Sequence, residues 1–405
     1  MTRDATVRVL PRMFVSSFLA LAVSSAFFVA CGEDDDASAG PGPGSGGGDA
    51  SIGDGAQQDS GSLDPDATAD GATEPALPPL DISKVEEKKW TWFEIPDTSC
   101  RDGSPTGIGL NLNPASKKMV IYLEGGGACF NIATCAQNPA KVPRQSHSGG
   151  ILDRSKTDNP VADWNQVYVP YCTGDVHSGN NPSADVQSVG TQKFVGYANM
   201  GIFLKRLAST FPATEQILLT GVSAGGFGAA ANFGQTVRIF PAAKVNLVDD
   251  SGPLMREPPL AQCLQEQWTT LWKLDTTVLA ECGADCAGQA DPLMAATKHW
   301  AKVKSGQAQG LISATGDQTI RFFFGFGASS CKSVVPISSG DYAAGLADVK
   351  AQHAAYANFG TFFYDGTGHT LLGGDGFYTT TVGQTTVADW VKDIVEANKA
   401  THVGP

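Results

Sequence analysis

The sequence is poor in histidine and in charged side chains. Only six of its 405 residues are histidines, and 17% are Asp, Glu, Lys or Arg. Residues 32–81 contain no Lys or Arg at all, yet they hold twelve acidic residues. Those twelve carboxylates account for all but one of the thirteen net negative charges at pH 7. The remaining chain is therefore close to neutral, and the basic surface needed to bind nucleic acid is missing, so we expect no nucleic-acid partner.

Large apolar residues are also scarce in residues 32–81, which consist mainly of Gly, Ser, Ala, Pro and Asp. Such a segment cannot bury enough apolar surface to offset the conformational entropy that ordering would cost. We therefore predict a disordered acidic linker over residues 32–81. Residues 82–405 contain no second linker and no internal repeat, and their length fits one large α/β domain, which we expect to be the catalytic domain.

An apolar run precedes this linker, FVSSFLALAVSSAFFVAC at residues 14–31, after a start that contains three arginines. The run is short for a membrane-spanning helix and predicts a signal peptide. It ends on small residues and Cys31, which is similar to the lipobox of bacterial lipoproteins, whose cysteine is lipidated. We therefore expect residues 1–31 to be a lipoprotein-type signal peptide and the protein to be exported and lipid-anchored to the bacterial cell envelope. An ordinary cleaved signal peptide, and hence secretion, is the alternative.

Cysteine and histidine pairs at metal-ligand spacing are scarce as well. Cys282 and Cys286 are separated by three residues, but no second pair follows that would complete a metal site. An even number of cysteines behind an export signal favours disulfides instead. The sequence therefore predicts a disulfide-stabilised domain without a metal, built on Cys100, Cys129, Cys135, Cys172, Cys263, Cys282, Cys286 and Cys331.

Six apolar runs rich in β-branched and aromatic residues alternate with helical patterns, among them residues 194–210 and 292–306. Buried strands that alternate with helices indicate an α/β fold with a mainly parallel central sheet and helices on both faces. In such sheets, ligands bind at the carboxyl ends of the strands. The polar turns that end these runs are therefore the candidates for a functional site. The runs are residues 117–127, 165–175, 216–226, 244–253, 310–318 and 359–370.

The third of these runs ends in the motif G-x-S-x-G around Ser223, within ILLTGVSAGGFGAAAN at 217–232. A strand, a sharp glycine-bracketed turn and a small-residue helix are typical of the nucleophile turn of α/β-hydrolases. In a chain with 47 glycines this motif also arises by chance, so other residues must support a nucleophilic role.

A serine nucleophile needs a base, and the base needs a carboxylate that orients it. His369 follows the last predicted strand in a glycine-flanked loop, whereas the other histidines lie in helical patterns, in the C-terminal tail or upstream of Ser223. Asp317 ends the strand between the two and completes the chain order Ser, Asp, His that is typical of α/β-hydrolases. Asp250, next to Asp249 at the end of the preceding strand, is the alternative acid.

Three glycines follow Glu124 after the first of the six runs. Hydrolysis of an ester forms an oxyanion that must be met by preorganised N–H donors. Glycines at this position let the backbone approach the oxyanion, as in the HGGG element of esterases. Ala224, directly after the serine, supplies a further N–H at the start of a helix, where the dipole favours negative charge.

Several blocks of the sequence resemble the pectin acetylesterase/Notum family, from about Cys100 to His369. This resemblance implies an α/β-hydrolase-like serine esterase that needs no cofactor. It places the nucleophile on Ser223, the acid on Asp317 and the base on His369, with oxyanion donors at Gly126, Gly127 and Ala224. The blocks are SCRDGSPTGIGLNLNP (99–114), LEGGGACFNIATC (123–135), WNQVYVPYCTGDVHSGN (164–180), LLTGVSAGGFGAAAN (218–232) and DDSGPL (249–254).

Two departures from the family pattern concern the substrate pocket and the base. Gly127-Ala128 stands where family members usually carry Trp after the Gly-Gly pair, and GTGHTLLGG replaces the usual aromatic and cysteine neighbours of the histidine. No long apolar lid segment is evident between Ser223 and His369. We therefore expect a monomeric serine carboxylesterase that hydrolyses short acyl esters, above all acetyl esters, on a carbohydrate.

Two alternatives stay open at this point. The first is a deacylase of lipidated peptides or lipid esters, which a deep apolar pocket over the serine would favour. The second is a non-catalytic carbohydrate-binding envelope protein on the same scaffold.

Overall fold

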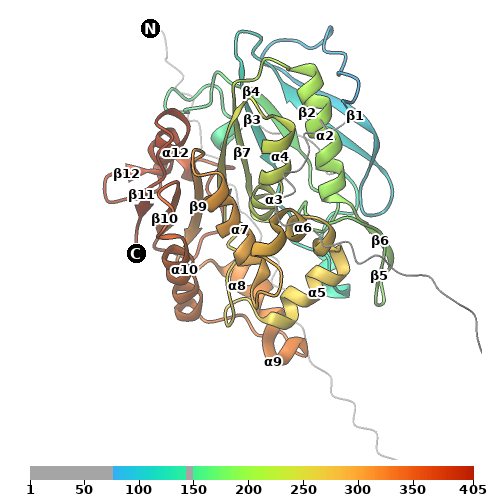
Figure 1. Cartoon of the computed structure of the whole chain (residues 1–405), viewed down its shortest axis with the longest axis vertical. Coiled ribbons are helices and arrows are strands. Elements are labelled where there is room, and N and C mark those ends of the chain that lie inside the picture. Colours follow the sequence, from blue (N-terminus) through green and yellow to red (C-terminus); the bar gives the residue numbers. More distant parts are fainter. Residues whose placement is uncertain (1–75, 143–148) are drawn as a thin grey trace, which may run out of the picture. The chain divides into compact units, whose positions relative to one another are not determined.

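The computed structural model describes residues 76–142 and 149–405 (Figure 1). The predicted signal peptide, its Cys31 and all of the predicted linker before residue 76 lie outside the described residues. No helix in the described ranges combines the length and the apolar character needed to cross a membrane.

Within these residues the chain forms a nine-stranded sheet with the strand order β1-β2-β4-β3-β7-β8-β9-β10-β13 and two small hairpins, β5-β6 and β11-β12. The strands are β1 (Trp90–Ser99), β2 (Pro105–Asn111), β3 (Lys118–Leu123), β4 (Asn165–Val169), β5 (Asn181–Val186), β6 (Gly190–Phe194), β7 (Gln216–Val222), β8 (Lys244–Asp250), β9 (Gln309–Ala314), β10 (Phe359–Tyr364), β11 (Thr381–Val382), β12 (Thr385–Thr386) and β13 (His402–Val403).

The helices connect the strands and cover the sheet. They are α1 (Ile132–Gln137), α2 (Gly196–Thr210), α3 (Ala224–Ala231), α4 (Phe233–Ile239), α5 (Gln262–Trp272), α6 (Val278–Cys282), α7 (Pro292–Val303), α8 (Gln318–Phe324), α9 (Ala328–Cys331), α10 (Ser339–His353), α11 (Gly376–Thr379) and α12 (Val387–Glu396).

The six apolar runs all form strands of this sheet, and these strands pair in parallel from β4 to β10. The prediction of a mainly parallel sheet is thereby confirmed. The edge made by β1 and β2 was not predicted. It is antiparallel to its neighbours, and the pairing of β1 shifts register between Glu94 and Ser99. Most side chains of β1 are at least partly exposed, so this strand lacks the continuous apolar run that marks the buried strands.

Helices cover both faces of the sheet, because side chains alternate across a strand. In β3, Met119, Ile121 and Leu123 pack in the same cluster as the buried side chains of α2 and α4. Val120 and Tyr122 point to the other face and pack in the cluster that contains α12. Helices α2 and α4 lie in front of the sheet in Figure 1. The predicted two-sided cover is therefore confirmed.

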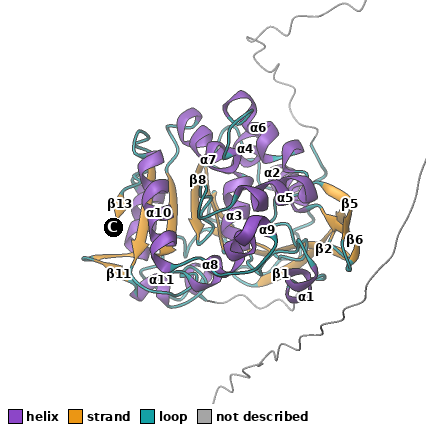
Figure 2. Ribbon diagram, turned by 90° about the horizontal axis from the view of Figure 1, so that it is seen from below, coloured by secondary structure: helices purple, strands orange, loops and turns teal. Residues whose placement is uncertain are grey.

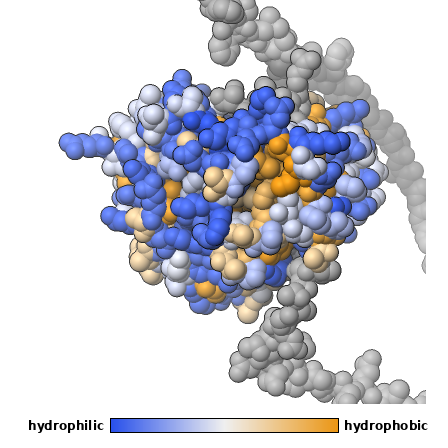
Figure 3. Space-filling model, turned by 90° about the horizontal axis from the view of Figure 1, so that it is seen from above, coloured by the Kyte–Doolittle hydropathy of each residue, from blue (hydrophilic) through white to orange (hydrophobic). Residues whose placement is uncertain are grey.

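One end of the sheet carries a group of further helices. Helix α3 follows β7 directly and α8 follows β9, so both lie at the carboxyl ends of the parallel strands. Figure 2, which looks onto this end, shows α3, α5, α8 and α9 grouped together. The opposite face is mostly hydrophilic, with a hydrophobic group right of centre and smaller ones at the left and lower edges (Figure 3).

Eight cysteines of the described chain form four disulfides, as the even count predicts. The pairs are Cys100–Cys172, Cys129–Cys135, Cys263–Cys331 and Cys282–Cys286. Cys282 and Cys286 thus bind each other. In residues 76–142 and 149–405 no group of three or more His, Cys, Asp or Glu side chains is placed to hold a metal ion.

Candidate active site

Ser223 lies in a strained turn between β7 and α3. Its φ of 57° and ψ of −121° are unfavourable for a residue with a side chain, and such strain is typical of a functional turn. The flanking glycines are required by close packing. A Cβ on Gly225 would lie 2.0 Å from the Leu123 carbonyl oxygen, and one on Gly221 would lie 2.3 Å from the carbonyl oxygen of Gly225. The glycines therefore let the turn fold tightly and present the serine at the end of the strand.

His369 and Asp317 form a hydrogen-bonded pair at the ends of β10 and β9. Nδ1 of His369 lies 2.7 Å from Oδ2 of Asp317, and that carboxylate is fully buried. Its other oxygen, Oδ1, accepts hydrogen bonds from the backbone N–H groups of Thr319 and Ile320, at 2.9 and 3.0 Å. The carboxylate thus caps α8, where the helix dipole favours its negative charge.

The second ring nitrogen of His369 is the atom that can act as a base. With Nδ1 carrying the proton that it donates to Asp317, Nε2 of the neutral ring holds the lone pair. This Nε2 is buried and has no hydrogen-bond partner in the part of the chain that the structure describes. A proton can therefore be accepted there.

Asp250 is placed differently from Asp317. Its Oδ2 accepts the backbone N–H groups of Leu371 and Leu372, at 2.6 and 2.7 Å, just after His369. Its backbone oxygen accepts the N–H of Ser223 at 2.7 Å. One residue thus holds both the serine turn and the histidine loop. Burial raises the pKa of the Asp250 carboxyl to about 6. Of the two acids considered from the sequence, Asp317 is the one that is hydrogen-bonded to Nδ1 of His369.

The triple glycine runs beside the serine. A Cβ on Gly125 would lie 3.0 Å from the Cβ of Ser223. Gly127 has a φ of 76°, a conformation that favours glycine. Among the described residues, no hydrogen bond uses the N–H of Gly126, Gly127 or Ala224. Three unused backbone donors thus lie in the segments that adjoin the serine.

The carbonyl groups of the same loop are firmly held. Nε2 of His177 lies 2.8 Å from the Glu124 carbonyl oxygen, and Nδ2 of Asn138 donates to the Gly126 carbonyl oxygen at 2.8 Å. The N–H of Tyr171 donates to the Glu124 carboxylate at 2.9 Å. Burial lowers the pKa of His177 to about 4, so its ring is neutral at pH 7 and donates to this carbonyl. Sequence reasoning set His177 aside because it precedes the serine, and it did not find Asn138.

A cavity opens at the serine and extends along α3. The empty space among its lining atoms, counted together with the open solvent at its mouth, is about 670 Å³. Ser223, Phe227 and Ala231 line it at successive turns of α3, so it reaches about 12 Å from the serine at 1.5 Å per residue. Trp268 and Trp272 of α5, stacked with ring centroids 5.5 Å apart, form part of the opposite wall.

This cavity corrects the expectation that no apolar segment covers the site between serine and histidine. Helices α5 and α6 and the turn between them contribute Trp268, Trp272, Leu274 and Val278 to the lining. In the sequence these residues are separated by polar ones, so they form one face of amphipathic helices and no continuous apolar run. The room left by Gly127-Ala128 is bounded by α8, since Phe323 would contact a Cβ on Gly127 at 3.1 Å.

Comparison with known proteins shows the family of the chain. The family model described as Pectinacetylesterase matches residues 91–297, just over half of the chain. The palmitoleoyl-protein carboxylesterase notum1a of Danio rerio is 32% identical over 171 residues, 39% of this chain and 33% of that protein. The Drosophila melanogaster NOTUM carboxylesterase is 31% identical over 211 residues, 45% of this chain and 31% of that protein. The chain therefore spans about a third of the length of the curated relatives it matches.

A solved structure shows the same fold. The crystal structure of the Wnt deacylase Notum from Drosophila superposes with a TM-score of 0.61 and 21% sequence identity, covering 77% of this chain and 95% of that one. The predicted α/β-hydrolase-like architecture is confirmed by this likeness.

Proposed function

Since the chain belongs to the pectinacetylesterase family of carboxylic ester hydrolases, we propose that Ser223 is its nucleophile and His369 its general base. Nε2 of His369 takes the hydroxyl proton while Oγ of the serine forms a bond to the acyl carbonyl carbon. The carbonyl oxygen becomes an oxyanion, which the N–H groups of Gly126, Gly127 and Ala224 stabilise. The support for this assignment is the hydrogen bond from Nδ1 to Asp317 at 2.7 Å, which leaves Nε2 as the basic atom.

The second half of the reaction uses the same groups. Collapse of the oxyanion breaks the ester bond, and Nε2–H of His369 protonates the leaving alcohol. The same nitrogen then takes a proton from water as the water oxygen attacks the acyl-enzyme, and returns it to Oγ of Ser223 as the acid product leaves. Asp317 stabilises the imidazolium in both steps.

For the substrate, the structure supports an acyl group longer than acetate. The cavity at Ser223 is lined almost entirely by aromatic and aliphatic side chains, which extend along α3 as far as Ala231. The expectation of an acetyl ester on a carbohydrate depended on the family resemblance and on a missing apolar wall, and α5, α6 and the turn between them supply apolar side chains for that wall. The relatives at about 30% identity are named palmitoleoyl-protein carboxylesterases, which agrees with an acyl-binding role. We therefore place the long-chain deacylase ahead of the acetylesterase.

Hydrolysis of p-nitrophenyl esters of increasing chain length tests this choice. Each methylene buried in an apolar pocket is worth about 0.8 kcal/mol, about four-fold in kcat/KM. We expect kcat/KM to rise from the C2 ester through C8. A maximum at C2 or C4 followed by a decline would restore the carbohydrate acetylesterase. No hydrolysis of any ester by a folded protein would favour the non-catalytic alternative.

We also propose that the enzyme acts as a monomer at the cell envelope, attached to the membrane through a lipid on Cys31. The support is the apolar run that ends on this cysteine and the acidic Gly/Ser/Pro/Asp-rich segment that follows it. The Cys31→Ala variant should move from the membrane fraction to the soluble fraction with its esterase activity intact. A fully soluble wild-type protein with a mature N-terminus other than Cys31 would contradict the anchor.

A further inference from the structure

The peptide group between Gly126 and Gly127 has a bonded carbonyl and an unused N–H. Nδ2 of Asn138 donates to the Gly126 carbonyl oxygen at 2.8 Å. The N–H of Gly127 belongs to the same peptide group and has no hydrogen-bond partner within the described ranges. A donor on the oxygen of an amide polarises the amide and makes its N–H a stronger donor, as in any chain of hydrogen bonds. The side chain of Asn138 therefore makes the Gly127 N–H, which adjoins the serine, a stronger hydrogen-bond donor.

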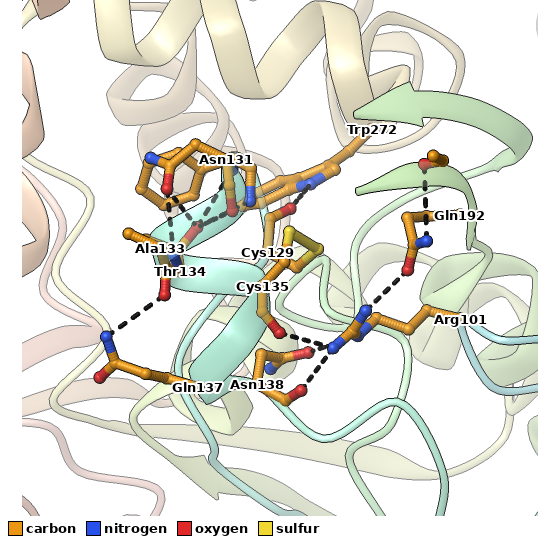
Figure 4. The surroundings of a disulfide bond; sticks show 12 residues. Arg101, Cys129, Asn131, Ala133, Thr134, Cys135, Gln137, Asn138, Gln192 and Trp272 are labelled. Carbon is orange, nitrogen blue, oxygen red and sulfur yellow. Dashed lines mark hydrogen bonds between the residues drawn. A yellow bond between two sulfur atoms is a disulfide. The ribbon is translucent and has the colours of Figure 1, made fainter. Parts of the chain in front are cut away.

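Asn138 is in turn polarised by Arg101. Nε of Arg101 donates to Oδ1 of Asn138 at 3.1 Å, and the same guanidinium donates to the backbone oxygens of Asn138 and Cys135, at 2.6 and 2.7 Å. Figure 4 shows the guanidinium pointing into this loop. An arginine only donates and a carbonyl oxygen only accepts, so the two partners of the Asn138 amide determine which of its atoms is oxygen.

Arg101 forms no direct ion pair with a carboxylate of the described residues, although the charge of the neighbouring Asp102 acts on it. The residue is 7% exposed, and in the described chain its side-chain partners are carbonyl groups and the amide of Gln192, at 2.7 Å for the latter. The neighbouring Asp102 bonds instead to Ser104 and pairs with Lys141. Burial lowers the pKa of Arg101, yet a guanidinium stays charged at neutral pH. The positive charge therefore acts on the loop that it contacts, offset in part by Asp102.

The loop that carries these groups is closed and supported on its other side. The disulfide Cys129–Cys135 ties the segment that follows Gly127 to α1, the helix that ends just before Asn138, and Nε1 of Trp272 donates to the Cys129 carbonyl oxygen at 3.1 Å (Figure 4). The N–H of Cys129 donates to the Gly174 carbonyl oxygen at 2.7 Å. These contacts hold the chain of donors in place, which is the condition for electrostatic preorganisation.

We propose that Arg101 and Asn138 are positioning residues that strengthen the Gly127 N–H as an oxyanion donor. The relay runs from the guanidinium through the Asn138 amide to the Gly126–Gly127 peptide. This inference rests on the proposed function, in which that N–H binds the oxyanion. The added strength matters most when negative charge develops in the transition state, so the relay raises kcat and leaves ester binding nearly unchanged.

The chain offers a matched control. Arg154 donates from Nε to Oδ1 of Asn111 at 2.9 Å and from the guanidinium to the backbone oxygens of Asn111 and Trp164, at 2.8 and 2.7 Å. Asn111 is 5% exposed, like Asn138. It pairs with Gln166 near the start of β4, at the end of the sheet away from the serine. The same substitution there places a carboxylate against a buried arginine without touching the oxyanion loop.

The experiment compares Asn138→Asp with Asn111→Asp in the full chain. Asp keeps the acceptor for the arginine and removes the Nδ2 donor. We expect Asn138→Asp to lower kcat for p-nitrophenyl octanoate about ten-fold or more, since losing an oxyanion donor outright costs about 10²–10³-fold. KM should stay within about two-fold, and Ki for octylboronic acid, whose adduct with Ser223 carries the oxyanion, should rise by the same factor as kcat falls. Asn111→Asp should leave kcat and Ki within about two-fold of the wild-type values, even if the substitution lowers the melting temperature.

Arg101→Lys and Arg101→Gln give a second measurement that does not depend on the asparagine variants. Both lose most of the guanidinium contacts, but only lysine keeps the charge, so we expect the higher kcat for lysine at similar melting temperatures. Equal kcat values for the two, or equal losses for Asn138→Asp and Asn111→Asp, would overturn the relay. A Ser223→Ala variant as active as the wild type would instead overturn the proposed function.

Discussion

The two sides of Ser223 are built from different parts of the chain. On one side the groups are polar and lie at or shortly beyond the carboxyl ends of sheet strands: Asp250 ends β8, Asp317 follows β9 and His369 follows β10. On the other side the lining is apolar and comes largely from helices, above all α3, α5 and α8. Parallel pairing places strand ends within hydrogen-bond reach of each other, whereas helices between strands can differ in length without moving the sheet. The comparison teaches that reaction chemistry and acyl selection can be changed separately.

The most severe change on the polar side is Ser223→Ala. Without Oγ only the oxyanion donors and substrate binding remain, so we expect kcat to fall by at least about 10³-fold, and by up to about 10⁶-fold as in other serine triads. Single-turnover hydrolysis of p-nitrophenyl octanoate measures the loss, and equilibrium binding of the uncleaved ester is the control. Residual activity near that of the wild type would show that another residue is the nucleophile.

The two buried acids should differ in their effect. Asp317→Asn leaves His369 without its carboxylate and should cost about 10³–10⁴-fold in kcat. Asp250→Asn keeps an acceptor for one N–H of the histidine loop and shifts that loop slightly, for which we expect about 10–10²-fold. Steady-state kinetics on both variants, with circular dichroism to confirm folding, decide between them. If the folded Asp250 variant is the inactive one, the triad acid has been assigned to the wrong strand.

The polar side was predictable from the sequence because its geometry follows from the strands. Each parallel strand is a continuous apolar run, and the residue after each run lies at the same edge of the sheet. Ser223, Asp317 and His369 were identified in this way, and the structure brings Asp317 and His369 into contact. The antiparallel edge was missed because β1 is largely exposed and β2, although buried, is interrupted by glycines, so neither strand shows a continuous apolar run.

The apolar side and the support of the oxyanion loop were not predictable in the same way. Trp268 and Trp272 are four residues apart on α5, a spacing that indicates one buried helix face but does not say which cavity the face lines. The contact of Arg101 with Asn138 joins residues 37 positions apart in sequence, and no local pattern encodes it. Such contacts depend on how separate elements pack.

A change on the apolar side should alter chain-length preference and leave the chemistry intact. Ala231 lines the cavity two turns along α3 from Ser223 and is 5% exposed. Ala231→Leu fills the far part of the cavity, so we expect kcat/KM for a C12 ester to fall about ten-fold while that for the C2 ester stays within about two-fold. The C2 ester is the internal control. An equal loss on both esters would mean that the substitution disturbs the serine turn.

The last prediction concerns how the free energy of unfolding depends on pH through Asp250. The folded-state pKa of Asp250 is about 6, above its ordinary value of about 3.9. The carboxyl therefore contributes stability below pH 4 that is lost as the pH rises through 6. The free energy of unfolding of the wild type minus that of Asp250→Asn should fall by on the order of 3 kcal/mol between pH 4 and pH 7. Urea denaturation at intervals of half a pH unit measures this difference, and His369 and Asp249 are present in both proteins. If the difference does not change with pH, Asp250 is not the group whose pKa is raised on folding.

The disulfide Cys263–Cys331 has a consequence for how the site can come apart. It closes a covalent ring that contains the cavity wall of α5 and α6 and also Asp317, which is part of the catalytic pair. The ring also contains β9, which pairs with β8 and β10 inside the sheet, so the part of it that can open without breaking the sheet is α5 to α7, residues 264–303. Hydrogen exchange should therefore show these helices as one cooperative unit that opens before β9. Such an opening removes the acyl wall but leaves Asp317 and Ser223 in place, and the disulfide keeps the start of α5 attached to α9, so that the wall can close again over an intact acid–base pair.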